Sequence, residues 1–168
     1  MQKFKTELKW GLIFLVAILT WSLMERLVGL HSTLIDKHAT YSNLFSIVAV
    51  AVYVFALKDK KAGDFNGQMT WKEGFISGVI ISVVIAVLTP FGQLVIAYVI
   101  SPEYFSNAIK YGVEHGLTTQ TEAEAYFNLK NYIIQSTLFA PVMGIVTSAV
   151  VAFFVKSKKA KPASEESS

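Results

Sequence analysis

Four long apolar blocks restrict the fold of this 168-residue chain more than any other feature. A helix rises about 1.5 Å per residue, so crossing the roughly 30 Å hydrocarbon core of a bilayer takes about 20 apolar residues. Four segments approach or exceed this length: 10–30, 41–57, 75–100 and 133–155. Most of the chain's hydrophobic residues, which make up 53% of its length, fall within them. The pattern predicts a single all-α domain over residues 1–155, an integral membrane four-helix bundle of two antiparallel hairpins.

The distribution of basic residues predicts how the chain is threaded through the membrane. Four crossings place both ends on one side, together with eleven of the 15 Lys and Arg residues: Lys3, Lys5, Lys9, Lys58, Lys60, Lys61, Lys72, Lys156, Lys158, Lys159 and Lys161. The 12 acidic residues divide evenly between the two sides. An excess of Lys and Arg without an excess of Asp and Glu is typical of the cytoplasmic side. We therefore expect both termini in the cytoplasm.

Glu25 and Arg26 interrupt the first block near its outer end. If the span enters at Trp10, Glu25 lies about 22 Å along the helix axis, close to the far edge of the core. Adjacent helix residues diverge by about 100°, so these two side chains do not face each other. We expect one to face the bundle or a polar pocket and the other to face the interface. An outer boundary is the preferred interpretation, and a functional ionisable site is the alternative.

Small residues recur every four positions in the last two spans. They are Gly74, Gly78, Ser82 and Ala86 in the third span, and Ser136, Ala140, Gly144, Ser148 and Ala152 in the fourth. Residues four apart lie along one side of a helix, and small ones let two helix backbones approach closely in lipid. We predict that the two stripes face each other or a second copy of the protein.

Each of these two spans also contains one proline in its outer half, Pro90 and Pro141. Proline removes a helix hydrogen bond and displaces the carbonyl four residues earlier, which predicts kinks. Nearby polar side chains can satisfy the freed groups. The preferred interpretation is structural, and the alternative is a small polar cavity near Gln93 and Gln135.

Residues 101–132 form the only long segment outside the blocks and predict a helical outer loop. Ser101-Pro102 is typical of a helix start, Gly116 of a helix end, and Thr121 with Glu124 of a capping box for a second helix. We interpret the segment as a helical lid on the outer surface. Residues 156–168 are polar, end in Ser and Glu, and predict a disordered cytoplasmic tail.

No pattern in the sequence predicts catalysis, a cofactor or a metal. HExxH, GxSxG and phosphate-loop motifs are absent, and there is no cysteine. His31 and His38 are seven residues apart, a weak spacing for metal ligands, so we expect these histidines and His115 to be solvated on the outer side. A net charge of +3 is too small to indicate nucleic acid as a partner.

Several stretches resemble a known family: LKDKKAGDFNGQMTWKEGFISGVIISV, ISPEYFSNAIKYGVEHG, EAEAYFNLKNYIIQS and GIVTSAVVAFFVKSK. They are similar to the bacterial family called domain of unknown function 4199, small membrane proteins with four spans. The similarity covers nearly the whole chain except the tail. It implies residence in the bacterial cytoplasmic (inner) membrane, and it supplies no activity, cofactor or catalytic residue.

Two functions remain open at this point. The favoured one is a non-enzymatic scaffold or accessory subunit, with the lipid bilayer as its surroundings and a second copy or an unidentified membrane protein as its partner. The alternative is a small transporter or channel component that uses polar groups between the spans, with Glu25, Arg26, Gln93 and Gln135 as the candidate polar site.

Overall fold

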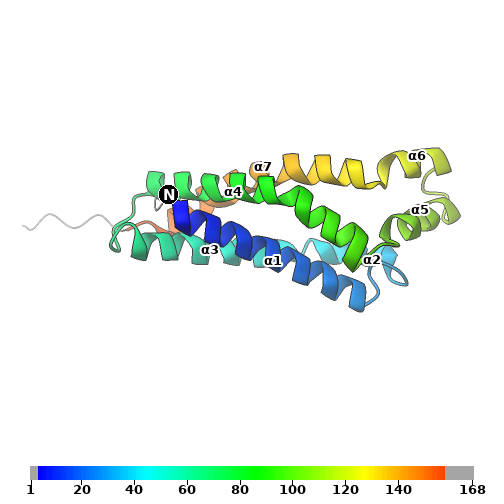
Figure 1. The fold of residues 1–168 in the computed structure, drawn as a ribbon, viewed down its shortest axis with the longest axis horizontal. Coiled ribbons are helices and arrows are strands. Elements are labelled where there is room, and N and C mark those ends of the chain that lie inside the picture. The colour runs from blue at the N-terminus through cyan, green and yellow to red at the C-terminus, as the bar shows by residue number, and fades with distance from the viewer. Residues whose placement is uncertain (1–3, 158–168) are drawn as a thin grey trace, which may run out of the picture.

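The computed structural model describes residues 4–157, which form helices and their connections. In chain order these are α1 (Lys5–Leu27), α2 (Ile35–Ser42), α3 (Phe45–Gly63), α4 (Trp71–Val95), the π-helical turn η2 (Ile96–Ile100), α5 (Tyr104–Glu114), α6 (Gln120–Tyr126) and α7 (Leu129–Val155). Figure 1 shows a long bundle in which the beginning of α1 and the end of α7 lie at the same end. We call this the terminal end, and the opposite end, formed by α2, α5 and α6, the loop end. Most of the predicted tail lies outside the described residues.

Within residues 4–157, four helical stretches are long and apolar enough to cross a membrane, which confirms the predicted fold class. They are α1, α2 with α3, α4 with η2, and α7. The helices extend past the apolar blocks: α1 begins at Lys5 rather than Trp10, and α4 begins at Trp71 rather than Phe75. This extension is possible because charged residues near the helix ends find partners within the bundle.

The small-residue stripes of α4 and α7 face each other along the most extensive helix contact in the bundle. A Cβ atom added at Gly78 would lie 2.5 Å from the Cβ and 3.3 Å from the Cα of Ser148, so a glycine is required there. Next along the stripe, the Ser82 hydroxyl donates to the Gly78 carbonyl and is 2.8 Å from the Tyr53 hydroxyl. The facing pairs are Gly74 with Ala152, Gly78 with Ser148, and Ser82 with Gly144. Ala86, Ser136 and Ala140 are half-buried.

Both prolines lie inside helices that continue through them. Figure 1 shows α4 changing direction part-way along its length. The Thr89 hydroxyl donates to the carbonyl of Ile85, so it remains with its own helix. The Thr137 hydroxyl is buried and has no hydrogen-bond partner among residues 4–157.

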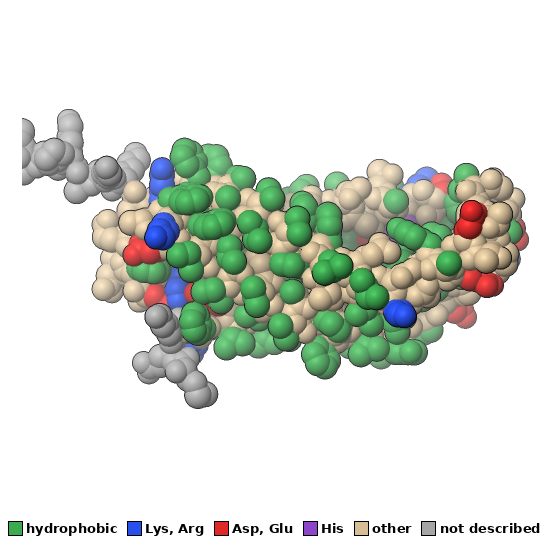
Figure 2. All heavy atoms as spheres, turned by 90° about the horizontal axis from the view of Figure 1, so that it is seen from above, with side chains coloured by type: hydrophobic (Ala, Val, Ile, Leu, Met, Phe, Trp, Pro, Cys, Tyr) green, Lys and Arg blue, Asp and Glu red, His purple; other side chains and the backbone are tan. Residues whose placement is uncertain are grey.

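The surface between the two ends is apolar. Figure 2 shows hydrophobic side chains over most of the length of the molecule, with charged side chains gathered mainly toward the ends. Side chains such as Val87, Leu138 and Phe154 are more than half exposed. Exposure of so much apolar surface to water would be unfavourable, whereas lipid tails are as apolar as these side chains and can surround them.

Helix starts at the loop end differ from two sequence predictions. Ser101 and Pro102 precede α5 rather than start it, because α5 begins at Tyr104 without a side-chain cap. The capping box of α6 is formed by Thr119 and Glu122, not by Thr121 and Glu124. Helix α3 also begins without a side-chain cap, and Ser42 is the last residue of α2. Gly116 does end a helix, since it follows α5 with a φ of 64°.

Candidate functional site at the loop end

The site is built around Glu25, which α1 buries in its last turn although it carries a carboxylate. Trp21, one turn earlier, donates its indole N–H to Glu25 Oε1 at 2.8 Å, and the Ser42 hydroxyl donates to the same oxygen. Arg26 is exposed, because its position on the helix turns it away from Glu25. The carboxylate therefore faces the pocket and the guanidinium faces outward.

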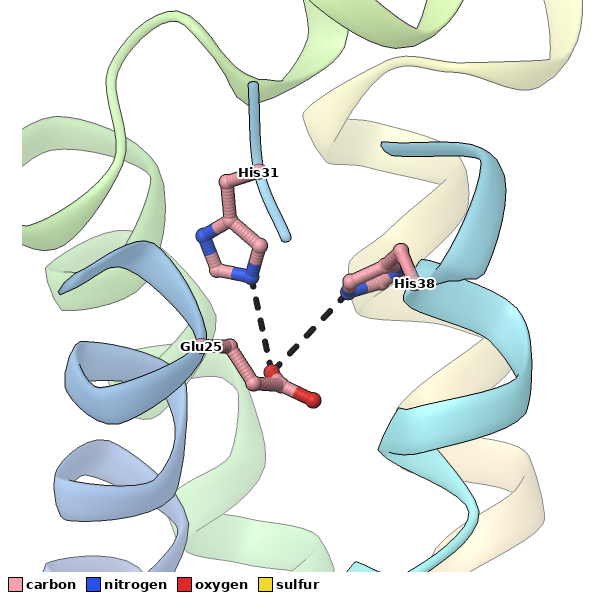
Figure 3. Close-up of side chains that lie close together, drawn as sticks. All are labelled: Glu25, His31 and His38. Atoms are coloured by element: carbon pink, nitrogen blue, oxygen red, sulfur yellow. Dashed lines mark ion pairs between the residues drawn. The ribbon is translucent and has the colours of Figure 1, made fainter. Parts of the chain in front are cut away.

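A reversal of the chain after α1 brings two histidines to this carboxylate. Gly29 adopts a φ of 87°, a conformation that favours glycine, and its carbonyl accepts the Leu34 amide. His31 follows in the turn and His38 lies on α2, and Figure 3 shows both rings beside Glu25. Their Nε2 atoms lie 3.4 Å and 3.9 Å from Glu25 Oε2.

The expectation of solvated histidines was wrong for two of the three. His31 is 5% exposed and His38 is half-buried, whereas His115 is exposed. The reason is tertiary: the turn and α2 fold back over α1 and are covered by α5. The seven-residue spacing of His31 and His38 in the sequence therefore does not predict that they are buried together.

Helix α5 covers the site with Tyr104 and Asn107. The Tyr104 hydroxyl lies 3.3 Å from His38 Nδ1 and 3.0 Å from the Tyr132 hydroxyl at the start of α7. Asn107 donates its side-chain amide to the His31 carbonyl at 2.9 Å. Burial raises the pKa of Tyr104, so its hydroxyl keeps its proton at neutral pH and remains a donor.

A cavity of about 260 Å³ adjoins the cluster. Gln93 of α4 and Ser101, which follows η2, are among the residues that line it. The extra residue in the π-helical turn shows in the 2.7 Å bond from the Ser101 amide to the Ile96 carbonyl, and such turns are frequent at functional sites. Gln135 is exposed and lines a different, surface hollow beside Leu138. The structure therefore places Glu25 and Gln93 at one cavity and leaves Arg26 and Gln135 outside it.

A family model described as a protein of unknown function (DUF4199) matches residues 9–157. The chain belongs to this family. No curated protein and no solved structure matches it. The roles of residues in this DUF4199 protein are therefore argued from its own geometry.

The DUF4199 protein has a second buried polar cluster, at the terminal end, which the sequence did not indicate. Glu7 is 1% exposed and its Oε1 accepts from Lys60 and Ser77, both at 2.8 Å. Lys60 also pairs with Asp64, the residue that directly follows α3. In the sequence, Glu7 and Lys60 each lie close to an apolar block. Many solvent-exposed residues also lie close to such a block, so this position does not predict burial.

The two clusters of the DUF4199 protein differ in what they can do chemically. At the terminal end, a lysine ammonium lies between two carboxylates, an arrangement that braces α1 against α3. At the loop end, Glu25, His31 and His38 place three potential metal-ligand atoms within 4.8 Å of one another beside a cavity. The loop-end cluster is the candidate site, because it combines ligand atoms with free volume.

Proposed function

We propose that this protein is a non-enzymatic accessory subunit of the bacterial cytoplasmic membrane that binds a small polar ligand at its loop end. One observation carries the proposal: Glu25 is buried beside a cavity of about 260 Å³ under α5, rather than exposed at the end of its span. A buried carboxylate is costly unless it is paired. Its retention next to free volume favours a binding role over a boundary role.

The positive-inside distribution supports a loop end that faces away from the cytoplasm. The terminal end carries most of the basic residues, and the two described chain ends lie there together. In this orientation a ligand enters from outside the cell. Reporter fusions at both termini should report cytoplasmic locations, and a fusion within 115–118 should report the opposite side.

The partner of this subunit is a second copy or another membrane protein. The small-residue stripes already pack within one chain, so a partner must use another surface. A photo-cross-linking residue at Leu117, which is 70% exposed at the loop end, tests this in native membranes. The matched position is Phe154, 79% exposed at the terminal end. A stoichiometric protein adduct from Leu117 is expected. Lipid adducts alone at both positions, with a strictly monomeric purified protein, would refute an accessory role.

A small transporter is the second candidate, and one observation favours it. The cavity at Glu25 shares Ser42 and Gln93 with a larger hollow of about 470 Å³ that extends to Tyr53 and Gly144 in the middle of the bundle. Beyond Tyr53 the bundle is closed by fully buried side chains such as Leu57 and Ile81. Transport therefore requires this packed half to open. Flux in proteoliposomes that Glu25→Gln and Gln93→Ala both reduce would favour transport over the accessory role.

A further inference from the structure

We infer that Glu25, His31 and His38 form a binding site for a divalent transition-metal ion, with zinc as the best fit. The inference rests on the proposed function, because it names the ligand of the same pocket. The three residues come from separate elements, the end of α1, the turn that follows it and α2. A short stretch of chain thus presents one carboxylate and two imidazoles to a common point, as Figure 3 shows.

The separations fit an ion better than they fit direct hydrogen bonds. Charge-assisted hydrogen bonds have lengths of about 2.7–2.9 Å, whereas the two Nε2 atoms lie 3.4 Å and 3.9 Å from Glu25 Oε2. Zinc bonds to nitrogen and oxygen of about 2.0–2.2 Å in tetrahedral geometry place neighbouring ligand atoms about 3.3–3.5 Å apart. Of the three pairs of ligand atoms, Glu25 with His31 already has this separation, and Glu25 with His38 needs to close by about half an ångström. The atoms of the third pair, His31 with His38, lie within 4.8 Å of each other.

His31 is an unusual residue to bury here without a ligand. The residue is 5% exposed, and its Nδ1 has no hydrogen-bond partner among the described residues. Buried polar atoms are nearly always paired, because desolvation without a partner costs free energy. Coordination through Nε2 replaces the 3.4 Å pairing with Glu25 Oε2 by a metal–ligand bond, which offsets the cost of the unpaired Nδ1 atom.

The surroundings orient the ligand atoms as the outer shell of a metal site does. Trp21 and Ser42 both donate to Glu25 Oε1, which leaves Oε2 to face the imidazoles. With a metal on Nε2, His38 carries its proton on Nδ1, 3.3 Å from the Tyr104 hydroxyl, which can accept it. Ligating histidines usually bond their second nitrogen in this way, and such partners set ring orientation.

Two nitrogen ligands and one oxygen ligand select the class of ion. Calcium and magnesium prefer ligand sets made of oxygen, whereas imidazole suits zinc and its transition-metal neighbours. The fourth position of a tetrahedral ion faces the adjoining cavity, where water or a ligand group completes the shell.

Metal binding to the purified full-length chain, without a polyhistidine tag and in lipid nanodiscs, tests the inference. After treatment with a chelator, calorimetric titration with Zn²⁺ should give one ion per chain, and Co²⁺ should give the visible absorption of a tetrahedral site. Glu25→Gln keeps the acceptor for Trp21 and Ser42 but removes the charge, and it should weaken zinc binding about 100-fold or more. Tyr104→Phe removes only the orienting hydroxyl and should weaken it about 10-fold.

His115→Gln is the matched control, because His115 is an exposed histidine at the same end and should leave affinity unchanged. Unfolding curves without metal verify that each variant is folded, and His38→Gln replaces Glu25→Gln if the latter is not. The inference is overturned if the wild type takes up no stoichiometric zinc, or if Glu25→Gln and His38→Gln both bind zinc as the wild type does. If the wild type binds no zinc but still gives the protein adduct from the cross-linker at Leu117, the metal site is refuted and the accessory role stands. If the wild type binds one zinc ion per chain but Leu117 gives no protein adduct, the accessory role is refuted and the metal site stands.

Discussion

The close approach of α4 and α7 predicts that one methyl group at Gly78 will destabilise the protein. A Cβ there would lie 2.5 Å from the Ser148 Cβ, about 0.9 Å short of ordinary contact at 3.4 Å. The Ser148 Cβ is fixed by its backbone, so rotation of the side chain does not relieve the overlap. The two helices must separate instead. A gap of 0.5–1 Å forfeits a quarter to a half of each dispersion contact, and overpacking costs about 1–3 kcal/mol. We expect Gly78→Ala to cost about 2–3 kcal/mol.

The compensating change makes the prediction specific to this contact. Ser148→Gly removes the opposing Cβ and should cost about 1 kcal/mol by itself, because glycine is unfavourable inside a helix. In the double variant the new methyl occupies the vacated space, so its cost should be about 1–2 kcal/mol rather than the sum of the two single costs. Contacting residues commonly show coupling energies of this size.

Equilibrium unfolding in mixed micelles, followed by circular dichroism, measures these free energies. Gly63→Ala is the control, since a Cβ at Gly63 meets nothing within 4 Å and φ is not positive there. That variant should match or exceed wild-type stability by up to about 1 kcal/mol. Additive costs in the double variant, or a Gly78→Ala protein as stable as the wild type, would show that the stripes do not pack as described.

Two further predictions concern the other polar groups. Lys60→Met leaves the Glu7 carboxylate buried without its cation, so it should lower the free energy of unfolding by about 3–5 kcal/mol in the same assay. Adding Glu7→Leu should recover most of that loss. Equal stability of the wild type and Lys60→Met would contradict this prediction. Thr119→Ala should weaken hydrogen-exchange protection of α6 by about 1 kcal/mol, whereas Thr121→Ala should not. The Thr119 backbone amide and hydroxyl donate to the Glu122 carboxylate and lower its pKa below the ordinary 4.5. The contribution of these two bonds is therefore present above pH 4.5 and is lost as pH falls through the lowered value, and α6 protection that is independent of pH would refute it.

The sequence predicted the spans and the packing stripes because both depend on short-range periodicity, and it left open whether the stripes face each other or a second copy. Hydropathy over about 20 residues identifies a span whatever its neighbours are, and a four-residue repeat defines one side of a helix. The register in which Gly78 meets Ser148 follows once the two helices run antiparallel and their stripes face each other. These features needed no knowledge of distant contacts.

Local ambiguity explains the errors at the loop end. A capping box requires only Ser or Thr followed three residues later by an acidic or amide side chain. Thr119 with Glu122 and Thr121 with Glu124 both satisfy it, and the sequence does not distinguish them. The structure selects the earlier pair, whose side chain and backbone bonds are both present.

The candidate site was only partly predictable for a different reason. One of Glu25 and Arg26 was expected to face a pocket, since helix geometry separates neighbouring side chains. The partners of Glu25 arrive through the turn at Gly29 and through α2, which fold over the helix end. Burial of His31 depends on this turn and on the cover from α5, where Asn107 holds its carbonyl. The spacing of the histidines in the sequence predicts neither this turn nor the position of α5.

The two buried carboxylates show why the loop end, rather than the terminal end, is where a ligand is expected. Glu7 faces Lys60, whose ammonium is a fixed positive charge on the neighbouring helix, so its charge is compensated inside the chain. Glu25 faces two imidazoles, which supply nitrogen ligands but no fixed charge, and the nearby Arg26 is turned outward. A buried carboxylate without a permanent counter-charge favours binding of a cation, because the cation restores neutrality in a region of low dielectric. The same fold thus neutralises the Glu7 carboxylate with a lysine of its own and leaves the Glu25 carboxylate without a permanent counter-charge.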